Sequence, residues 1–99
     1  MMGWKIFDES VDMIERRHRY FPHLFRWRGQ RYQVDAVERC WTVSRRGWKK
    51  SVRGHFFQVR AGGGSFELFQ DAETGLWQVR RARLEGRRAP ARRAAVAWR

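Results

Sequence analysis

The sequence predicts an all-β domain, a small antiparallel meander of five to six strands that forms an SH3-like or half-open barrel. Three observations predict it. Apolar side chains alternate with polar ones along much of residues 1–82, and short turns that contain glycine separate the alternating segments. The 99 residues leave room for one domain at most. The six tryptophans and seven phenylalanines indicate that this domain, residues 1–82, folds around a largely aromatic core.

The first part of the chain contains a strand and a hairpin. The opening segment, up to His18, carries signs of both strand and helix, and we expect a strand. Residues 24–28 alternate rings with guanidinium groups, which fits a strand. Gly29-Gln30 then supplies a two-residue turn, so that residues 24–36 form a hairpin with its arginines on the outer face. A change of phase at Ala36-Val37 predicts a β-bulge that bends the second strand.

The middle of the chain is dominated by charge. Residues 44–54 are too charged for a core and too short for an amphipathic helix, and glycines stand at positions 47 and 54. We therefore expect an exposed loop. Trp48 lies in this segment, where no alternation assigns it to the inside or the outside.

The second part of the chain continues the meander. The expected elements are a strand over 55–61, a hairpin connection at 62–64, a return strand over 65–70, a type I turn at 71–75 and a strand over 76–81. From residue 83 the composition changes to Gly, Ala, Pro and Arg, and Pro90 interrupts any helix. Residues 83–99 are predicted to be a mobile basic tail, with a possible short helix at 91–98.

Alternation along the strands assigns one set of side chains to the interior. An aromatic residue at strand spacing belongs to a core more often than to a binding surface. The predicted inner residues are Phe25, Trp27, Tyr32, Val34, Trp41, Phe57, Val59, Phe66, Leu68, Trp77 and Val79.

The formal net charge of +12 is distributed unevenly. Between Leu24 and Arg60, ten Lys or Arg residues oppose two acids, and large aromatic rings lie among them. Guanidinium groups contact phosphate and stack on bases, so this mixture favours binding of nucleic acid. The candidate binding residues are Arg26, Arg28, Arg31, Arg45, Arg46, Trp48, Lys49, Lys50, Arg53 and Arg60.

These candidates form one continuous patch if the outer face of the first hairpin meets the charged segment. Such a patch would neutralise about five phosphates, which implies a log-log salt slope near −4 to −5 on duplex DNA. Trp48, and His55 or Phe56 at the edge of the patch, would stack on an unpaired base. We therefore expect single-stranded or distorted DNA to be preferred to intact duplex, and DNA to be preferred to RNA.

The sequence shows no arrangement of residues that predicts catalysis. It lacks a recognisable nucleophile beside a base, and the acids at positions 8, 9, 12 and 15 are expected to pair with neighbours such as Arg16 and Arg17. We expect no enzymatic activity, no metal and no cofactor. A single cysteine, and the lack of a long apolar stretch, predict a cytoplasmic protein without membrane contact, associated with the nucleoid if it binds DNA.

A pattern of spaced aromatics and glycines runs through the chain. It consists of Phe25-Arg-Trp-Arg-Gly-x-x-Tyr-x-Val34, Trp41, Gly47-Trp48, Phe57-x-Val59, Phe66-Glu-Leu-Phe69 and Thr74-Gly75-x-Trp77. This pattern, over roughly residues 6–82, resembles an uncharacterised bacterial domain family. That family occurs as stand-alone proteins and at the C-terminus of Y-family DNA polymerase-like proteins of damage-tolerance mutasomes. The resemblance implies a role in DNA repair or translesion synthesis and implies no catalytic residues. The family's frequent second tryptophan after position 48 is Lys49 here, and the arginine-rich tail is not part of the family pattern.

A second function remains open. Small barrels also serve as protein-interaction modules whose sheet edge or groove accepts a partner strand, or whose basic surface meets an acidic partner. In that case the partner would be another component of a repair or polymerase complex. The sequence leaves the oligomeric state open.

Overall fold

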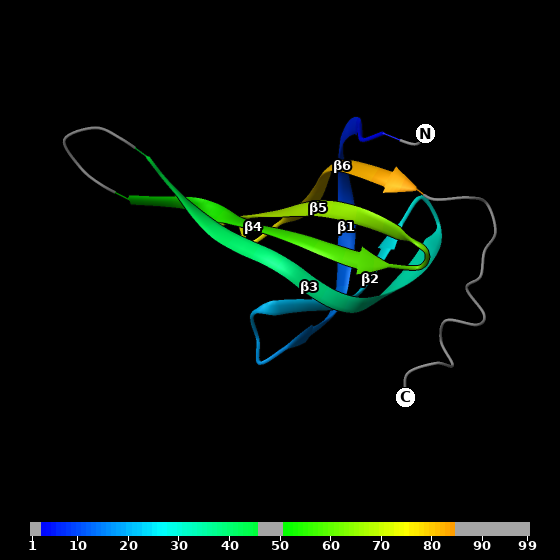
Figure 1. The fold of residues 1–99 in the computed structure, drawn as a ribbon. Helices are drawn as coiled ribbons and strands as arrows, with labels where there is room; N and C mark the ends of the chain where they lie inside the picture. Colours follow the sequence, from blue (N-terminus) through cyan, green and yellow to red (C-terminus); the bar gives the residue numbers. More distant parts are fainter. Residues whose placement is uncertain (1–2, 46–50, 85–99) are drawn as a thin grey trace.

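The computed structural model describes residues 3–45 and 51–84. These residues form six strands in a closed antiparallel barrel, in which neighbours in sequence are neighbours in space (Figure 1). The strands are β1 (Lys5–Arg17), β2 (Phe21–Trp27), β3 (Gln30–Arg45), β4 (Ser51–Ala61), β5 (Gly64–Asp71) and β6 (Trp77–Leu84). The predicted all-β meander is therefore confirmed, and pairing of β1 with β6 closes it completely. None of the described residues belongs to a helix that could cross a membrane.

Two of the hairpin turns have the same geometry. Arg28 and Gly29 have φ angles of 54° and 75°, and Gly62 and Gly63 have φ angles of 52° and 80°. Two consecutive residues in the left-handed region characterise the type I′ turn, whose twist matches that of the flanking strands. The prediction placed the first turn one residue too late, because Gln30 already belongs to β3.

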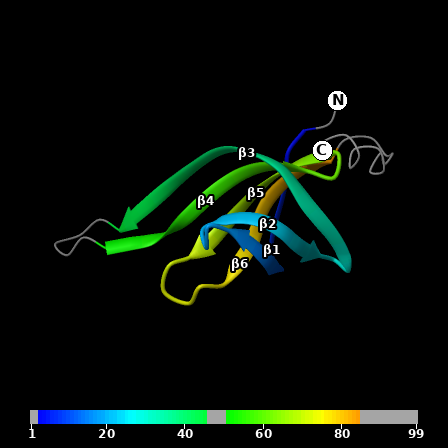
Figure 2. The same ribbon diagram turned by 90° about the horizontal axis from the view of Figure 1, so that it is seen from below.

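Strand β3 bends at two bulges on either side of Ala36-Val37. Asp35 is the extra residue between the pairs Val34–Ala61 and Ala36–Arg60, and Glu38 is the extra residue one step later. A bulge was predicted here, but a second one was not. Each extra residue increases the local twist and bends the strand. Figure 2 shows the result, in which β3 arches from β2 over β4 towards the tip of the β3–β4 hairpin.

The predicted exposed loop over 44–54 is wrong at both ends. β3 continues to Arg45 and β4 begins at Ser51, and these two residues pair with each other. The long hairpin leaves the barrel, because the pairing of β4 with β5 begins only at Gly54. We call residues 43–45 and 51–53 the arm. Residues 46–50, at the centre of the predicted loop, lie outside the described residues.

The prediction for the C-terminal segment also changes at its boundary. β6 continues to Leu84, two residues beyond the boundary that we placed at 82. The rest of the predicted tail, residues 85–99, lies outside the described part of the chain.

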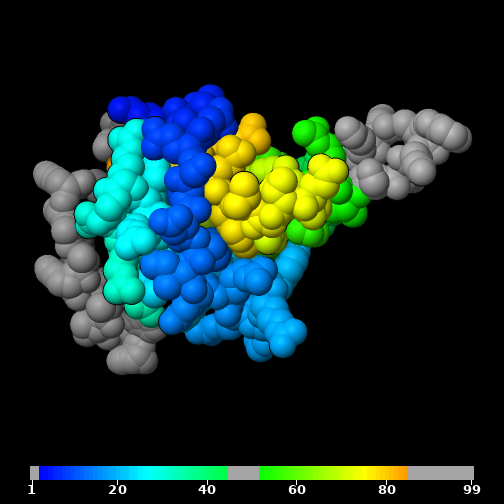
Figure 3. Space-filling view, turned by 180° about the vertical axis from the view of Figure 1, so that it is seen from behind, coloured from blue at the N-terminus to red at the C-terminus, as the bar shows by residue number. Residues whose placement is uncertain are grey.

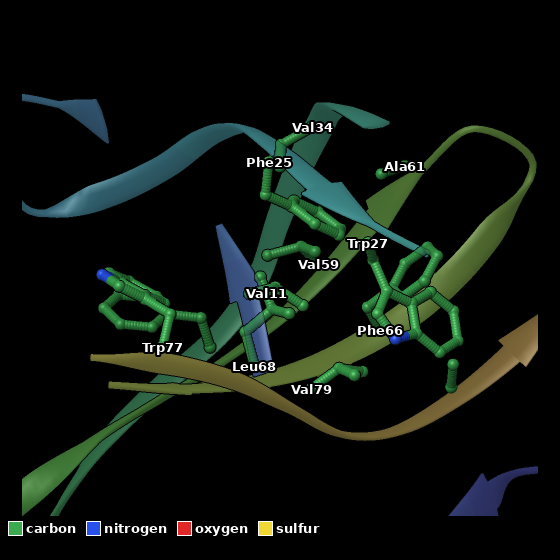
Figure 4. Close-up of a cluster of buried hydrophobic side chains, with 12 residues drawn as sticks. Val11, Phe25, Trp27, Val34, Val59, Ala61, Phe66, Leu68, Trp77 and Val79 are labelled. Atoms are coloured by element: carbon green, nitrogen blue, oxygen red, sulfur yellow. The ribbon is translucent and has the colours of Figure 1, made fainter. Parts of the chain in front are cut away.

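The core lies inside the barrel and contains nine of the eleven predicted inner residues. Trp27 and Phe66 fill one end, Trp77 lies at the other, and aliphatic side chains lie between them (Figure 4). Tyr32 is half-buried and packs against this cluster. The prediction missed four of the buried hydrophobic residues, Val11, Ala61, Phe69 and Ala82.

Trp41 is the one predicted inner residue that lies on the wrong face. Its cross-strand partner is Phe56, whereas the neighbouring Cys40 pairs with Phe57, which is fully buried in the core. The physical reason is the second bulge at Glu38, which restores the phase of alternation that the first bulge had changed. Trp41 therefore lies on the outer face of the sheet.

Candidate nucleic-acid interface

The first group of predicted binding residues lies on the β2–β3 hairpin. Arg26 is directly opposite Arg31 on β3 and directly opposite Asp12 on β1, so the three side chains form a row across the outer face. The Arg26 Nη2 atom lies 3.4 Å from Asp12 Oδ2. Within the described residues Arg31 makes no ion pair. Asp12 thus partly neutralises one of the two adjacent arginines.

Arg28 has a structural role at the hairpin turn. Its Nε and Nη2 atoms donate hydrogen bonds of 2.9 and 2.6 Å to the two carboxylate oxygens of Glu9 on β1. The indole Nε1 of Trp27 donates a third bond, of 2.9 Å, to the same carboxylate. The hydrogen bonds from Arg28 have the largest effect and the bond from Trp27 the next largest, and together they lower the pKa of Glu9 from 4.5 to about 2. The carboxylate in turn raises the pKa of Arg28. Because its guanidinium group is used to fix the turn against β1, Arg28 is poorly placed to meet a phosphate.

Of the remaining predicted residues, the structure describes Arg53 and Arg60 on β4 and the backbone of Arg45 at the end of β3. Arg60 forms an ion pair with Glu38, with 3.1 Å between Nη2 and Oε2. Arg53 is exposed and lies seven residues earlier on the same strand, a separation of about 23 Å at the usual rise of a strand. Arg45 ends β3, and Arg46, Trp48, Lys49 and Lys50 lie outside the described residues.

The structure therefore separates the predicted residues into two groups. Seen from behind, the β2–β3 hairpin and the arm lie at opposite ends of the molecule (Figure 3). The hairpin group contains two arginines that are paired with carboxylates, Arg26 and Arg28. Arg45 and Arg53 belong to the arm, where β3 and β4 leave the barrel, and Arg60 lies apart from them on β4, opposite Ala36.

At the base of the arm, the structure contains a feature that sequence reasoning missed. Trp41, Phe56 and Phe69 are directly opposite one another on β3, β4 and β5 and form a row on the outer face of the sheet. The Trp41 and Phe56 rings are stacked, with centroids 5.1 Å apart and planes at 16°. Phe56 and Phe69 are 4.7 Å apart and tilted by 47°. We call these three residues the outer aromatic row.

A glycine in β4 makes room for one end of this row. A Cβ atom at Gly54 would lie far inside contact distance of the Phe69 ring and 2.5 Å from the carbonyl oxygen of Gln70. An aromatic ring that covers a glycine on a neighbouring strand is a known way to stabilise a sheet. Gly54 was interpreted as the end of a loop, but its role is to accept this ring.

Two arginines lie on the outer aromatic row. The Arg39 guanidinium carbon is 4.9 Å from the centroid of Trp41, and Arg80 lies 5.8 Å from Phe56 and 5.9 Å from Phe69. Arg80 is also bonded to Asp8, with 2.6 Å between Nε and Oδ1. Arg39, in contrast, is exposed and makes no ion pair within the described part of the chain. The Trp41 end of the row is therefore covered by a cation that has no carboxylate partner among the described residues.

A second site of this kind lies at the other end of the sheet. Trp4 lies under Arg81 and Arg83, whose guanidinium carbons are 4.6 and 5.2 Å from its ring. Arg81 is held by Glu67, with 2.8 Å between Nε and Oε1. Trp4 thus provides a comparison for Trp41, since it is also half-buried and also lies under arginines.

The arrangement at the outer aromatic row suits the binding of a flat, negatively charged ligand. Aromatic rings and guanidinium planes on a sheet surface stack on unpaired bases, and basic groups beside them contact the phosphates. In residues 3–45 and 51–84, no three His, Cys, Asp or Glu side chains lie close enough together to hold a metal ion. Comparisons of the chain with protein-family models, with curated proteins and with solved structures found no match.

Proposed function

We propose that this protein is a non-catalytic nucleic-acid-binding module that favours single-stranded or distorted DNA and assists DNA repair or translesion synthesis. The observation that carries the proposal is the Trp41 end of the outer aromatic row, where the ring lies under Arg39 at the base of the arm. The repair context rests on the resemblance of the aromatic and glycine pattern to the mutasome-associated family. We propose a cytoplasmic protein that is associated with the nucleoid.

Base stacking on Trp41 is the first part of the proposed interaction. A cation over a ring at the protein surface contributes about 0.5–1 kcal/mol, whereas a stacked base contributes about 1–3 kcal/mol. A base can therefore replace Arg39 on the ring, and the released guanidinium group can turn to the adjacent phosphate. A paired base within a duplex presents no free face to Trp41, so that unpaired or distorted DNA is favoured.

Electrostatic attraction by the arm is the second part. Val43, the first residue of the arm, is only two positions beyond Trp41, and the sequence at the end of the hairpin contains Arg45, Arg46, Lys49, Lys50 and Arg53. A strand stacked on Trp41 would extend its phosphates along these cations. Each phosphate contact on a single strand contributes about −0.7 to the log-log salt slope.

Fluorescence anisotropy with a labelled DNA single strand, a duplex and an RNA of equal length tests the proposal. The single strand should be about 16 nucleotides long, near the upper end of the site sizes of small barrels. We expect the DNA single strand to bind most tightly. Trp41→Ala should cost about 1–3 kcal/mol, which is a loss of about 5- to 150-fold in affinity.

Trp4→Ala is the matched control. It removes a ring that also lies under arginines but at the far end of the sheet, and the affinity should not change. Equal losses in the two variants would contradict the assignment of the site to the outer aromatic row. Binding weaker than ~100 μM at moderate salt, which is the weak limit of non-specific DNA binding, would contradict the function itself.

A further inference from the structure

Strand β3 changes its pairing partner along its length. Its pairing with β2 covers Gln30–Gln33, whereas its pairing with β4 covers Val34–Arg45. The first two residues of β2, Phe21 and Pro22, pair only with β1. In Figure 1 the turn between β1 and β2 (blue) accordingly lies apart from the middle of β3. Beyond Gln33, the described part of the chain leaves one edge of β3 without a partner strand.

A groove of about 780 Å³ lies between the β1–β2 turn and the unpaired edge of β3. One side is lined by residues around the β1–β2 turn, among them Arg17, His18 and Phe21, and the other side by β3 from Gln33 to Cys40. An unpaired strand edge presents free N–H and C=O groups, which accept another strand unless the protein protects them. The groove is thus bounded by a strand edge that can form further hydrogen bonds.

The protection of this edge is uneven. The bulges at Asp35 and Glu38 interrupt its first part, and an acidic side chain stands at each of them. From Arg39 to Val43 the pairing with β4 is uninterrupted, and the segment contains neither proline nor an acid. This five-residue stretch is regular on the side that faces β4, so its other side presents a regular row of hydrogen-bonding groups.

We infer that the edge of β3 from Arg39 to Val43 binds an acidic, extended segment of a partner protein as an added strand. Addition of a strand to an exposed sheet edge is a common mode of peptide recognition, in which main-chain hydrogen bonds supply affinity and side-chain contacts supply specificity. The groove beside Cys40 receives the side chains of that strand.

Charge selects an acidic segment as the occupant. Arg17, which lies on the β1–β2 side of the groove, and Arg39, on the β3 side, are exposed and have no carboxylate partner within the described residues. Of the two carboxylates on the groove, Glu38 is already paired with Arg60. A second copy of this chain, with a formal charge of +12, would bring like charges together at the same edge. A segment with alternating carboxylates would instead pair with both arginines.

Nuclear magnetic resonance of the ¹⁵N-labelled full chain tests the inference. The probe is an acetylated and amidated peptide of alternating Glu and Val, added to about 1 mM, which detects even a weak complex of about −4 kcal/mol. We expect shifts and slowed amide exchange at residues 39–43, with smaller shifts at the β1–β2 turn. A Lys-Val peptide of equal length should leave these amides unchanged.

Two controls separate strand addition from simple charge attraction. A Glu-Val peptide that is N-methylated at its central residues keeps its charge but cannot donate main-chain hydrogen bonds, and it should not bind. In the protein, Arg17→Glu should weaken the Glu-Val peptide several-fold and permit binding of the Lys-Val peptide. Among the described residues, Arg39 and Arg80, and not Arg17, lie over the rings of the outer aromatic row, so this variant should retain its affinity for DNA.

Three results would overturn the inference. The first is the absence of any change at residues 39–43, and the second is equal binding of the methylated peptide. The third is a concentration-dependent change at these amides without peptide, which would assign the edge to a second copy of the chain.

Discussion

The interior of the barrel and its outer face each contain a group of aromatic rings, and the two groups differ in what holds the neighbouring arginine. Inside, Phe25, Phe66 and Trp27 are at most 3% exposed, and Arg28 at their rim is bonded to Glu9 through both carboxylate oxygens. Outside, Arg80 is paired with Asp8, but Arg39 lies on the ring of Trp41 and makes no ion pair within residues 3–45 and 51–84. A charge-assisted pair of bonds fixes the first arginine, whereas a weak cation–π contact leaves the second available. The contrast distinguishes arginines that build the fold from arginines that can bind a ligand.

The largest expected effect separates two neighbouring residues on opposite faces. Phe57 is fully buried in the core, and Phe57→Ala should lower the free energy of unfolding by about 3–5 kcal/mol. Phe56 lies in the outer aromatic row, where Phe56→Ala removes two ring pairs and should cost about 1–2 kcal/mol. Urea denaturation measures both. If both variants lost the same free energy of unfolding, the outer aromatic row would contribute as much to stability as the interior core does.

The next effect concerns the glycine that accepts the outer ring. Gly54→Ala would place a methyl group against Phe69 and against the carbonyl oxygen of Gln70, and the backbone cannot easily move away. Overpacking of this kind costs about 1–3 kcal/mol. Gly3→Ala is the control, since no atom lies within 4 Å of its added Cβ. A neutral Gly54→Ala would show that Phe69 does not depend on this space.

Much of the barrel could be predicted because the alternation is local. Residues 24–28 and 55–61 show alternating side chains in the sequence itself, and glycines mark the turns at 29 and 62–63. Trp41 could not be assigned in this way. Its face depends on the number of bulges that precede it, and Glu38 carries no sequence signal that distinguishes a bulge from a regular strand position.

The candidate site was predicted less well, because its contacts join distant parts of the chain. Clustering of Lys and Arg in the sequence identified Arg26 and Arg28 but not the carboxylates of Asp12 and Glu9 that engage them from another strand. The outer aromatic row joins three strands. Trp41 was predicted to be a core residue, Phe69 was not assigned to the interior, and Phe56 was placed at the edge of the predicted binding patch. One signal was present, since Gly54 within a strand indicates the close approach of another group.

The salt dependence of DNA binding sharpens the comparison of the two kinds of arginine. Arg39→Ser should reduce the log-log slope on single-stranded DNA by about 0.7, the contribution of one phosphate. Arg26→Ser should leave the slope unchanged, since Asp12 already partly neutralises that side chain. Anisotropy over a salt series measures both slopes. A larger change for Arg26→Ser would move the binding surface to the β2–β3 hairpin.

The smallest expected effect is the acid sensitivity of the barrel rim. The pKa of Glu9 is about 2 in the folded protein, against an ordinary value of 4.5, because Arg28 and Trp27 donate hydrogen bonds to its charged form. Ionised Glu9 therefore contributes stability that is fully present above pH 4.5 and is lost as the pH falls through 2. The backbone N–H groups of Thr74 and Glu73 also lower the pKa of Asp71. Protonation of Asp71 at low pH therefore destabilises the folded protein as well.

Glu9→Gln should consequently be less stable than the parent protein near neutral pH and should lose less stability between pH 4.5 and 2. Urea denaturation across this range measures how the free energy of unfolding changes with pH. Asp71→Asn should independently reduce the loss of stability at low pH. The affinity for single-stranded DNA at neutral pH should not change in Glu9→Gln. Glu9 holds Trp27 and Arg28 at the β2–β3 hairpin and does not hold the outer aromatic row. An unaltered acid slope in the variant would show that the carboxylate is not bonded to Arg28 in solution. Arg28 would then be as available to a ligand as Arg39, and the distinction between the two arginines would fail.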